Sequence, residues 1–379
     1  MQKEIIVMGD IEMGAGNLTD DFISDSALSE LILSLAKQEH PIDLILNWDT
    51  LDFLKCPYIV DGQENFPRHI TEDISLTKLQ SIYEAHHRVF AAMKVFVKSS
   101  PHHFIYFITG NHDHELFFKG VQVKLRGLLG NSKRVVFSGL KYQSHGVHVE
   151  HGHQYDFLHK INFKNLFLNY KGKSILNFPW SSFSLMTAFM DLKKKHPFME
   201  RITPRPLLFS LHGMVLRRVS LRSIGYFLKS LLYFPFRYYS DPTYTLPDKL
   251  FSEFYYRFKN GHWDVDEIID VFSKKKKDSH YKIFVLGHIH QLKIKKGRKK
   301  VVIHPGSWRD EYRLDAQTRM LIPTTKYYVK IVVADNSELQ YEVLEYPLQR
   351  SVFLFDDVRR DELTYIYLAA HEEGFKLRI

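Results

Sequence analysis

The sequence predicts an α/β fold that is interrupted by a basic, helical insertion. In residues 1–156, short apolar runs alternate with stretches of helical period, which is the pattern of strands layered with helices. Over residues 157–280 this pattern stops and aromatic and basic residues predominate, until an apolar run at 282–286 restores it. With 379 residues, 45% of them hydrophobic, the chain is long enough to bury a large core.

The apolar runs and helical periods fix the expected order of elements. Helices are expected over 25–37, with Ser24 or Asp25 as the cap, and over 76–98. Further helices are expected inside the insertion over 163–168, 183–192, 207–218, 224–236 and 248–258, and in the tail over 357–371. The expected strands are 5–8, 44–47, 104–109, 147–150, 282–286, 301–304, 326–333 and 338–346.

Three parts follow from this order: a core of residues 1–156 and 281–346, an insertion of residues 157–280, and a charged tail of residues 347–379. Residues 157–300 hold 28 Lys and Arg against 10 Asp and Glu, a net +18. Because the whole chain carries +9, the remainder carries −9. An acidic body therefore bears a basic insertion, which we expect to cap the functional site.

The sequence also indicates the cellular compartment in which the protein is expected. The single cysteine, Cys56, excludes an internal disulfide framework and favours a reducing environment. We expect no secretory signal, because Asp10 follows the first apolar run at once. We also expect no transmembrane segment, since the longest uncharged stretch, 174–190, contains a proline and several polar residues. The expected location is cytoplasmic, with peripheral attachment at the inner membrane face as an extension.

Polar residues with metal-ligand chemistry stand where the expected strands end. Ligand sites in open α/β sheets lie at the carboxyl ends of strands. Two divalent metals about 3.5–4 Å apart can share a carboxylate and be completed by His, Asn and carboxylate ligands. One such histidine alone would more often be structural, but seven candidates in this arrangement predict a metal site. They are Asp10, Glu12, Asp49, Asn111, His151, His288 and His290.

The segments Gly110-Asn111-His112-Asp113 and Gly287-His288-Ile289-His290, with Asp10, Asp49 and His151 at other strand ends, resemble the signature of the calcineurin-like metallophosphoesterase family. The resemblance covers about residues 1–156 and 281–346. It implies a four-layer α/β/β/α sandwich and hydrolysis of a phosphoester by a hydroxide that bridges two metals.

The resemblance also implies a role for each residue. Asp49 would bridge the metals, and His112 would protonate the leaving oxygen, with Asp113 or another carboxylate orienting it. One metal would be held by Asp10, the residue at position 12 and His290, and the other by Asn111, His151 and His288.

Two positions depart from the family pattern. Glu12 stands where the family usually has histidine, and Trp48 where it usually has glycine. If Glu12 is a ligand, the added carboxylate favours harder ions such as Mn²⁺ or Mg²⁺; otherwise it points away and weakens one site. Two divalent ions are the expected cofactors, with Mn²⁺ as the first choice and Mg²⁺, Fe or Zn as the others.

Segments around residues 14–22 and 46–53 resemble the bacterial branch related to UDP-2,3-diacylglucosamine pyrophosphohydrolase. This resemblance implies a lipid-linked or nucleotide-linked diphosphate as substrate. The alternatives are a nuclease or nucleotide phosphodiesterase, and, in a different class, a non-catalytic docking module with a degenerate metal site.

Large aromatic residues stand next to cations in the insertion, as in Phe178-Pro179-Trp180 and residues 231–239. Such a surface suits an anionic membrane or single-stranded nucleic acid, or it is an ordinary helical core with solvated lysines. The candidate substrate contacts are Arg217 and Arg218 in the insertion and His153, which could instead support a metal ligand. The sequence does not predict an oligomeric state.

Overall fold

Two β-sheets packed face to face form the centre of the protein. The computed structural model describes residues 2–47, 49–247, 249–252, 255, 272, 280–336 and 338–378. The six-stranded sheet has the order β18-β17-β1-β2-β5-β6, with bounds β1 Lys3–Gly9, β2 Ile42–Asn47, β5 His103–Ile108, β6 Val135–Phe137, β17 Lys326–Val333 and β18 Leu339–Tyr346. The five-stranded sheet has the order β13-β14-β12-β8-β7, with bounds β7 Lys141–Ser144, β8 Val147–Glu150, β12 Ile283–Leu286, β13 Leu292–Lys296 and β14 Val301–Pro305.

Strand β1 shows why its sequence is a continuous apolar run. Ile5 and Val7 pack between the two sheets, whereas Ile6 and Met8 pack against the helices on the other side. A strand buried on both faces needs apolar side chains at every position. All eight expected strands are present within a residue or two of their predicted bounds, and the predicted α/β fold class is confirmed.

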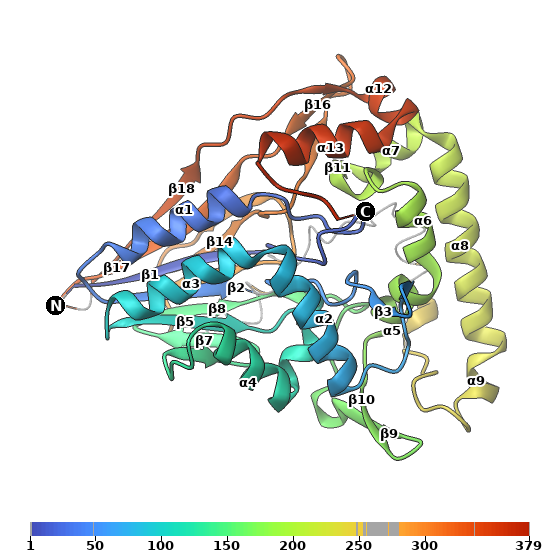
Figure 1. Ribbon diagram of the computed structural model, residues 1–379, viewed down its shortest axis with the longest axis horizontal. Helices are drawn as coiled ribbons and strands as arrows, with labels where there is room; N and C mark the ends of the chain where they lie inside the picture. Colours follow the sequence, from blue (N-terminus) through green and yellow to red (C-terminus); the bar gives the residue numbers. More distant parts are fainter. Residues whose placement is uncertain are drawn as a thin grey trace.

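Helices cover the outer face of the six-stranded sheet (Figure 1). They are α1 Asp25–Ala36, α2 Glu72–Ala85, α3 His87–Ser99 and α4 Lys119–Leu128. The single helix expected over 76–98 is wrong, because the helix breaks at His86, whose φ of −113° and ψ of 29° are not helical. The His86 ring is fully buried and lies 2.7 Å from Asp25 Oδ1 and 2.9 Å from Asp20 Oδ2.

His86 gives the fold a pH dependence. Burial lowers its pKa, but Asp25 and Asp20 outweigh burial and raise the pKa to about 10. Because this exceeds the unfolded value of about 6.5, its stabilisation is complete below about pH 6.5 and is lost as the pH rises towards 10. We expect His86→Gln to lower the free energy of unfolding by a few kcal/mol at pH 6 and by much less at pH 9.5, measured by urea unfolding. A difference that is the same at both pH values would mean that His86 is neutral in the folded protein.

The outer face of the five-stranded sheet carries a smaller apolar cluster. Phe284, Leu286 and Val302 pack there with Phe272, and Tyr155 and Tyr281 lie at its margin. The layers of the protein are therefore, in order, the helices, the six-stranded sheet, the five-stranded sheet and this cluster. The tip of the β13–β14 hairpin is closed by a hydrogen bond from Gly297 N to Lys300 O of 2.7 Å, in the lysine-rich stretch at 295–300.

The insertion is helical only in part. The helix expected over 163–168 is wrong, because a short 3-10 turn, Phe163–Asn165, leads into a hairpin of β9 Phe167–Tyr170 and β10 Lys173–Leu176. The two helices expected over 207–218 and 224–236 are also wrong in their bounds. Within the described residues of the insertion up to Arg237, the helices are α5 Trp180–Ser184, a π-helical turn Leu185–Phe189, α6 Met190–Lys195, α7 Arg205–Leu211, α8 Gly213–Leu232 and α9 Phe234–Arg237. Trp48 lies outside the described residues, and so does most of the helix expected over 248–258.

A second core joins the insertion to the C-terminal tail. A four-stranded sheet, in the order β11-β15-β16-β19, consists of β11 Ile202–Thr203, β15 Tyr312–Leu314, β16 Met320–Pro323 and β19 Phe353–Leu354. The tail adds α12 Phe355–Arg360 and α13 Glu362–Glu372, in place of the one helix expected over 357–371. Phe198, Tyr312, Phe353 and Ile366 pack together in this core, so the tail is folded onto the body (Figure 1).

A short hairpin pairs β3 Tyr58–Val60 with β4 Gln63–Asn65. Figure 1 shows α8 as a long helix at the margin of the molecule opposite the N-terminus. Among the described residues, no helix combines the length and the apolar character needed to cross a bilayer.

Candidate metal and phosphoester site

The carboxyl ends of parallel strands bring the candidate ligands together. β1, β2 and β5 run parallel in the first sheet, and β8 and β12 run parallel in the second. Asp10, Asp49 and Asn111 follow the first three strands, and His151 and His288 follow the other two. The site therefore lies where the edges formed by the carboxyl ends of the strands in the two sheets meet.

Four of these side chains form a compact group. His151 Nε2 lies 2.8 Å from Asn111 Oδ1 and 3.1 Å from Asp49 Oδ2. His151 Nδ1 lies 3.7 Å from Asp10 Oδ1. One ligand atom from each of Asp10, Asp49 and His151 lies within 4.8 Å of the other two, and all three residues are buried. Two carboxylates, an imidazole and an amide oxygen are a ligand set that suits a divalent cation.

The electrostatics of this group also favour a bound cation. Burial raises the pKa of Asp10 to about 6, despite the nearby His151 and His290. Burial alone would also raise the pKa of Asp49, but His151 and His112 hold it well below its usual value. Among the described residues, neither carboxylate pairs with a lysine or arginine. Since a buried carboxylate is costly without a partner, these residues fit a divalent ion.

The backbone at the site is strained. Asp10, Glu12, Asp49 and His288 have φ values of 49°, 56°, 42° and 72°, in the left-handed region that non-glycine residues rarely adopt. Such residues cost about 1–3 kcal/mol each and gather at functional sites. A Cβ at Gly110 would lie 2.1 Å from Asp49 Oδ1, so glycine is required before Asn111 for the carboxylate to keep its place.

The two histidines of the Gly-His-Ile-His segment turn to different partners. The backbone N–H of His288 donates to Asp10, and its Nε2 lies 3.2 Å from Asp156 Oδ2. His290 Nδ1 lies 2.7 Å from Glu311 Oε1, and its Nε2 is 4.0 Å from Asp10 Oδ1. Asp156 thus joins the site through His288.

His112 lies beside the cluster, and its carboxylate partner is Asp52. The His112 ring is 15% exposed, and its Nδ1 lies 2.9 Å from Asp52 Oδ1. Burial lowers the pKa of His112, but Asp52, Glu12 and Asp49 outweigh burial and raise it to about 10. Asp113 instead accepts backbone N–H groups from Gly110 and Thr50, at 2.6 and 3.1 Å. The expected partner of His112 is Asp113 or another carboxylate. That carboxylate is Asp52, so the choice of Asp113 is corrected: Asp113 fixes the loop instead.

Glu12 points towards cations of the protein. Its Oε2 lies 2.6 Å from Lys55 Nζ, and its Oε1 lies 3.2 Å from Arg309 Nη1. Burial works against ionisation of Glu12, but Arg309 and Lys55 outweigh it and hold its pKa well below the usual range. Lys55, Asp52 and Arg309 are not among the site residues that the sequence predicts. Arg309 follows β14, so the strand-end criterion that found the other residues could have found it.

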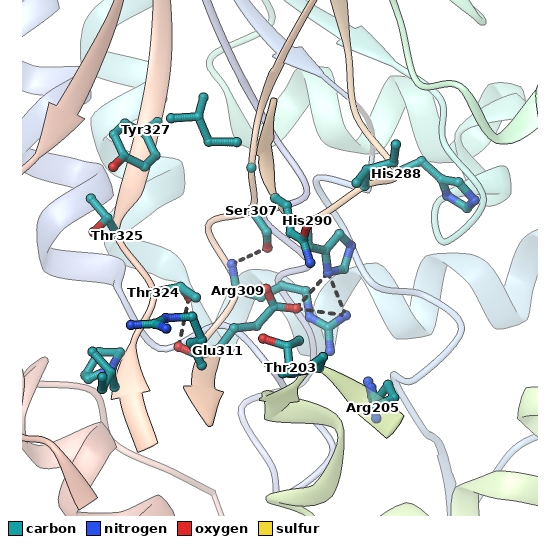
Figure 2. Close-up of a pocket in the computed structure, with 18 residues that line it drawn as sticks. Thr203, Arg205, His288, His290, Ser307, Arg309, Glu311, Thr324, Thr325 and Tyr327 are labelled. Carbon is teal, nitrogen blue, oxygen red and sulfur yellow. Dashed lines mark hydrogen bonds and ion pairs between the residues drawn. The ribbon is translucent and has the colours of Figure 1, made fainter. Parts of the chain in front are cut away.

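A cavity of about 740 Å³ opens beside His288 and His290. Figure 2 shows His290, Arg309 and Glu311 converging on one another at this cavity, while the His288 ring points away from them. Arg205, Arg309 and Arg313 also line it, which suits an anionic substrate.

The three candidate substrate contacts lie elsewhere. Arg217 and Arg218 are exposed residues of α8, and Arg218 contacts His196. His153 is buried behind His151, with 5.1 Å between the ring centroids. None of the three is among the residues that line the cavity.

The sequence matches no protein-family profile and no curated protein. Among solved structures, the chain is similar to a protein from Streptococcus pneumoniae TIGR4 described as a predicted phosphoesterase, with 10% identity and a TM-score of 0.29, over 93% of this chain and 98% of that one. It is similar to Vacuolar Protein Sorting 29 from Cryptosporidium parvum, with 11% identity and a TM-score of 0.28, over 91% and 98%. A Staphylococcus aureus protein described as a candidate 5′-nucleotidase, in complex with alpha-ketoglutarate, has 12% identity and a TM-score of 0.30, over 99% and 58%.

Proposed function

We propose that this protein is a metal-dependent phosphoester hydrolase of the calcineurin-like type. One observation carries the proposal: Asp10, Asp49, Asn111 and His151 converge within coordination range at the facing strand ends, with His112 alongside. These four residues would hold a divalent ion, which would supply polarisation of a phosphoryl oxygen and a lowered pKa for bound water.

The chain's own residues supply the proton for the leaving oxygen and orient the ring that donates it. Asp52 holds Nδ1 of His112, so Nε2, on the opposite side of the ring, is the atom that protonates the leaving oxygen. The His112 backbone N–H donates to Asp49 Oδ1 at 2.7 Å, which ties the position of the acid to that of the metal ligand. A positioned imidazole of this kind contributes about 10²–10⁴-fold to the rate.

A screen of phosphate esters with the purified, Mn²⁺-loaded protein tests the proposal. We expect turnover of bis-p-nitrophenyl phosphate, loss of turnover with EDTA, and recovery when Mn²⁺ is added back. Absence of turnover on every monoester, diester and diphosphate, in a protein that retains metal, would favour the docking-module alternative instead.

For the substrate, we propose a lipid-linked or nucleotide-linked diphosphate. The support is the arginine-lined cavity next to the candidate ligands, because a diphosphate brings several negative charges. We expect Arg205→Ala to raise KM about tenfold or more with a smaller change in kcat, since the side chain acts in binding. Steady-state kinetics on the best diphosphate measures this, with Arg298→Ala in the β13–β14 turn as the control. An unchanged KM would place the substrate elsewhere.

We further propose that α8 rests on an anionic membrane, which would bring the enzyme to a lipid-linked substrate. The helix carries four basic residues and no acidic residue. Its exposed apolar side chains are Met214, Leu216, Leu221, Ile224, Leu228 and Leu232. Apolar and basic residues on one exposed helix match an interface of acyl chains and anionic head groups.

Cosedimentation with phosphatidylglycerol vesicles tests this surface. Binding should fall when Leu221 and Leu228 are both changed to serine, and neutral vesicles should bind less. The runner-up is a nuclease or nucleotide phosphodiesterase, in which the same cations would bind nucleic acid. Salt-dependent binding of an oligonucleotide, without vesicle binding, would favour that alternative.

A further inference from the structure

We infer that the site holds one divalent ion, and that the side chains of Lys55 and Arg309 take the place of the second. The inference rests on the proposed function and narrows it to a mononuclear centre assisted by two protein cations. It departs from the two-ion centre that the sequence resemblance implies.

The candidate ligands fall into two groups with opposite electrostatic character. Asp10 and Asp49 are buried carboxylates whose close charged neighbours are histidines. Glu12 is a buried carboxylate with two permanent cations on it, Lys55 at 2.6 Å and Arg309 at 3.2 Å. The first group requires a cation from outside the chain, and the second already has its cations.

Glu12, Asp52 and His112 each have a ligand atom within 4.8 Å of the other two, but the cations on Glu12 leave no place for a second divalent ion beside it. A carboxylate oxygen must come within about 2.0–2.2 Å of a bound metal, but Oε2 of Glu12 meets Lys55 and Oε1 meets Arg309. An ion at either oxygen would lie within about 5 Å of a fixed positive charge in a buried site, where like charges repel strongly. Lys55 and Arg309 also carry together the two positive charges that the ion would bring.

The cation pair cannot simply turn aside, because Asp21 fixes both members from behind. Asp21 Oδ2 lies 2.6 Å from Lys55 Nζ and 2.9 Å from Arg309 Nη2. Lys193 of α6 in turn lies 2.8 Å from Asp21 Oδ1. Asp21, Lys55 and Lys193 are at most 2% exposed, so the pair is part of the packed interior that joins the body to the insertion.

Each cation has a separate task. Lys55 Nζ lies 2.9 Å from Asp52 Oδ2, and Asp52 holds the His112 ring, so Lys55 is a positioning residue that links Glu12 to the general acid. Arg309 lines the cavity beside His290 (Figure 2). From there its guanidinium can meet the phosphoryl oxygens that the second ion would otherwise bind.

Counting bound metal tests the inference without any activity assay. The purified protein is dialysed to equilibrium against saturating Mn²⁺, bound metal is measured by plasma mass spectrometry, and the Mn²⁺ EPR spectrum is recorded. We expect one ion per chain and the six-line spectrum of an isolated Mn²⁺. Two ions per chain with an exchange-coupled spectrum would overturn the inference and leave the proposed function intact. No bound ion would overturn the proposed function itself.

Three variants sharpen the count. Glu12→Gln should keep one ion with a dissociation constant within about threefold of the original, because Glu12 is not a ligand, whereas the matched change Asp10→Asn should weaken binding by about 10-fold or more. The triple change Glu12→His, Lys55→Met and Arg309→Met exchanges the cation pair for an imidazole and should raise the count to two. Loss of the ion in Glu12→Gln, with Asp10→Asn still binding, would show that the ion sits on Glu12 and overturn the inference.

Discussion

Asparagine in place of Asp49 is expected to abolish both metal retention and hydrolysis. The change keeps the size of the side chain and an oxygen that can accept the His112 N–H. It removes the charge that faces His151 at 3.1 Å and that a cation needs. Since a bound divalent ion supplies several kcal/mol of transition-state stabilisation, we expect kcat to fall about 10³-fold or more. Turnover of bis-p-nitrophenyl phosphate at saturating Mn²⁺ measures the effect.

Thermal unfolding with and without Mn²⁺ separates a lost site from a lost fold. The unchanged protein should melt at a higher temperature with Mn²⁺, because an ion that binds only the folded state stabilises it. Asp49→Asn should lose this rise and melt near the value of the metal-free protein. Glu342→Gln, on the exposed side of β18, is the control and should change neither quantity. A Mn²⁺-dependent rise that persists in Asp49→Asn would remove Asp49 from the metal site.

The site could be predicted from sequence as far as position along a strand determines position in space. Asp10, Asp49, Asn111, His151 and His288 all follow parallel strands, and parallel strands deliver their carboxyl ends to one edge. That Lys55 and Arg309 pair with Glu12 could not be predicted in this way. Lys55 and Arg309 are separated by more than 250 positions, and neither belongs to a motif with a known spacing. Their role arises from ion pairs that exist only in the folded chain.

The errors in the insertion have a local cause. Residues 163–168 have the apolar spacing of a helix, but Lys171 and Gly172 have φ values of 51° and 76°. Two successive residues with positive φ form the tight turn that matches the twist of a hairpin. Phe167 of β9 packs against Phe118, with ring centroids 5.1 Å apart, so the strand is held by the body. Turn geometry and this long-range contact override the helical period.

Replacing Arg201 with methionine is expected to destabilise the whole fold. Arg201 is completely buried, pairs with Asp310, and donates to the backbone oxygen of Asp20 at 2.6 Å. Asp310 also pairs with Arg350 of the C-terminal tail, so Arg201 joins the insertion to the start of the body and to the tail. The change removes one of the two arginines that neutralise the buried Asp310, and breaking a buried ion pair costs about 3–5 kcal/mol.

Urea unfolding of the metal-free protein measures this cost, so that metal binding does not contribute. Arg360→Met is the matched control, because Arg360 is 74% exposed and pairs with Asp357 at 3.6 Å within one helical turn. An exposed pair of this kind contributes about 0.5 kcal/mol or less. If Arg201→Met and Arg360→Met lower the free energy of unfolding equally, the buried ion pairs do not hold the insertion and the tail to the body. A loss of several kcal/mol in Arg201→Met alone would show that they do, because the two changes differ in burial and not in charge.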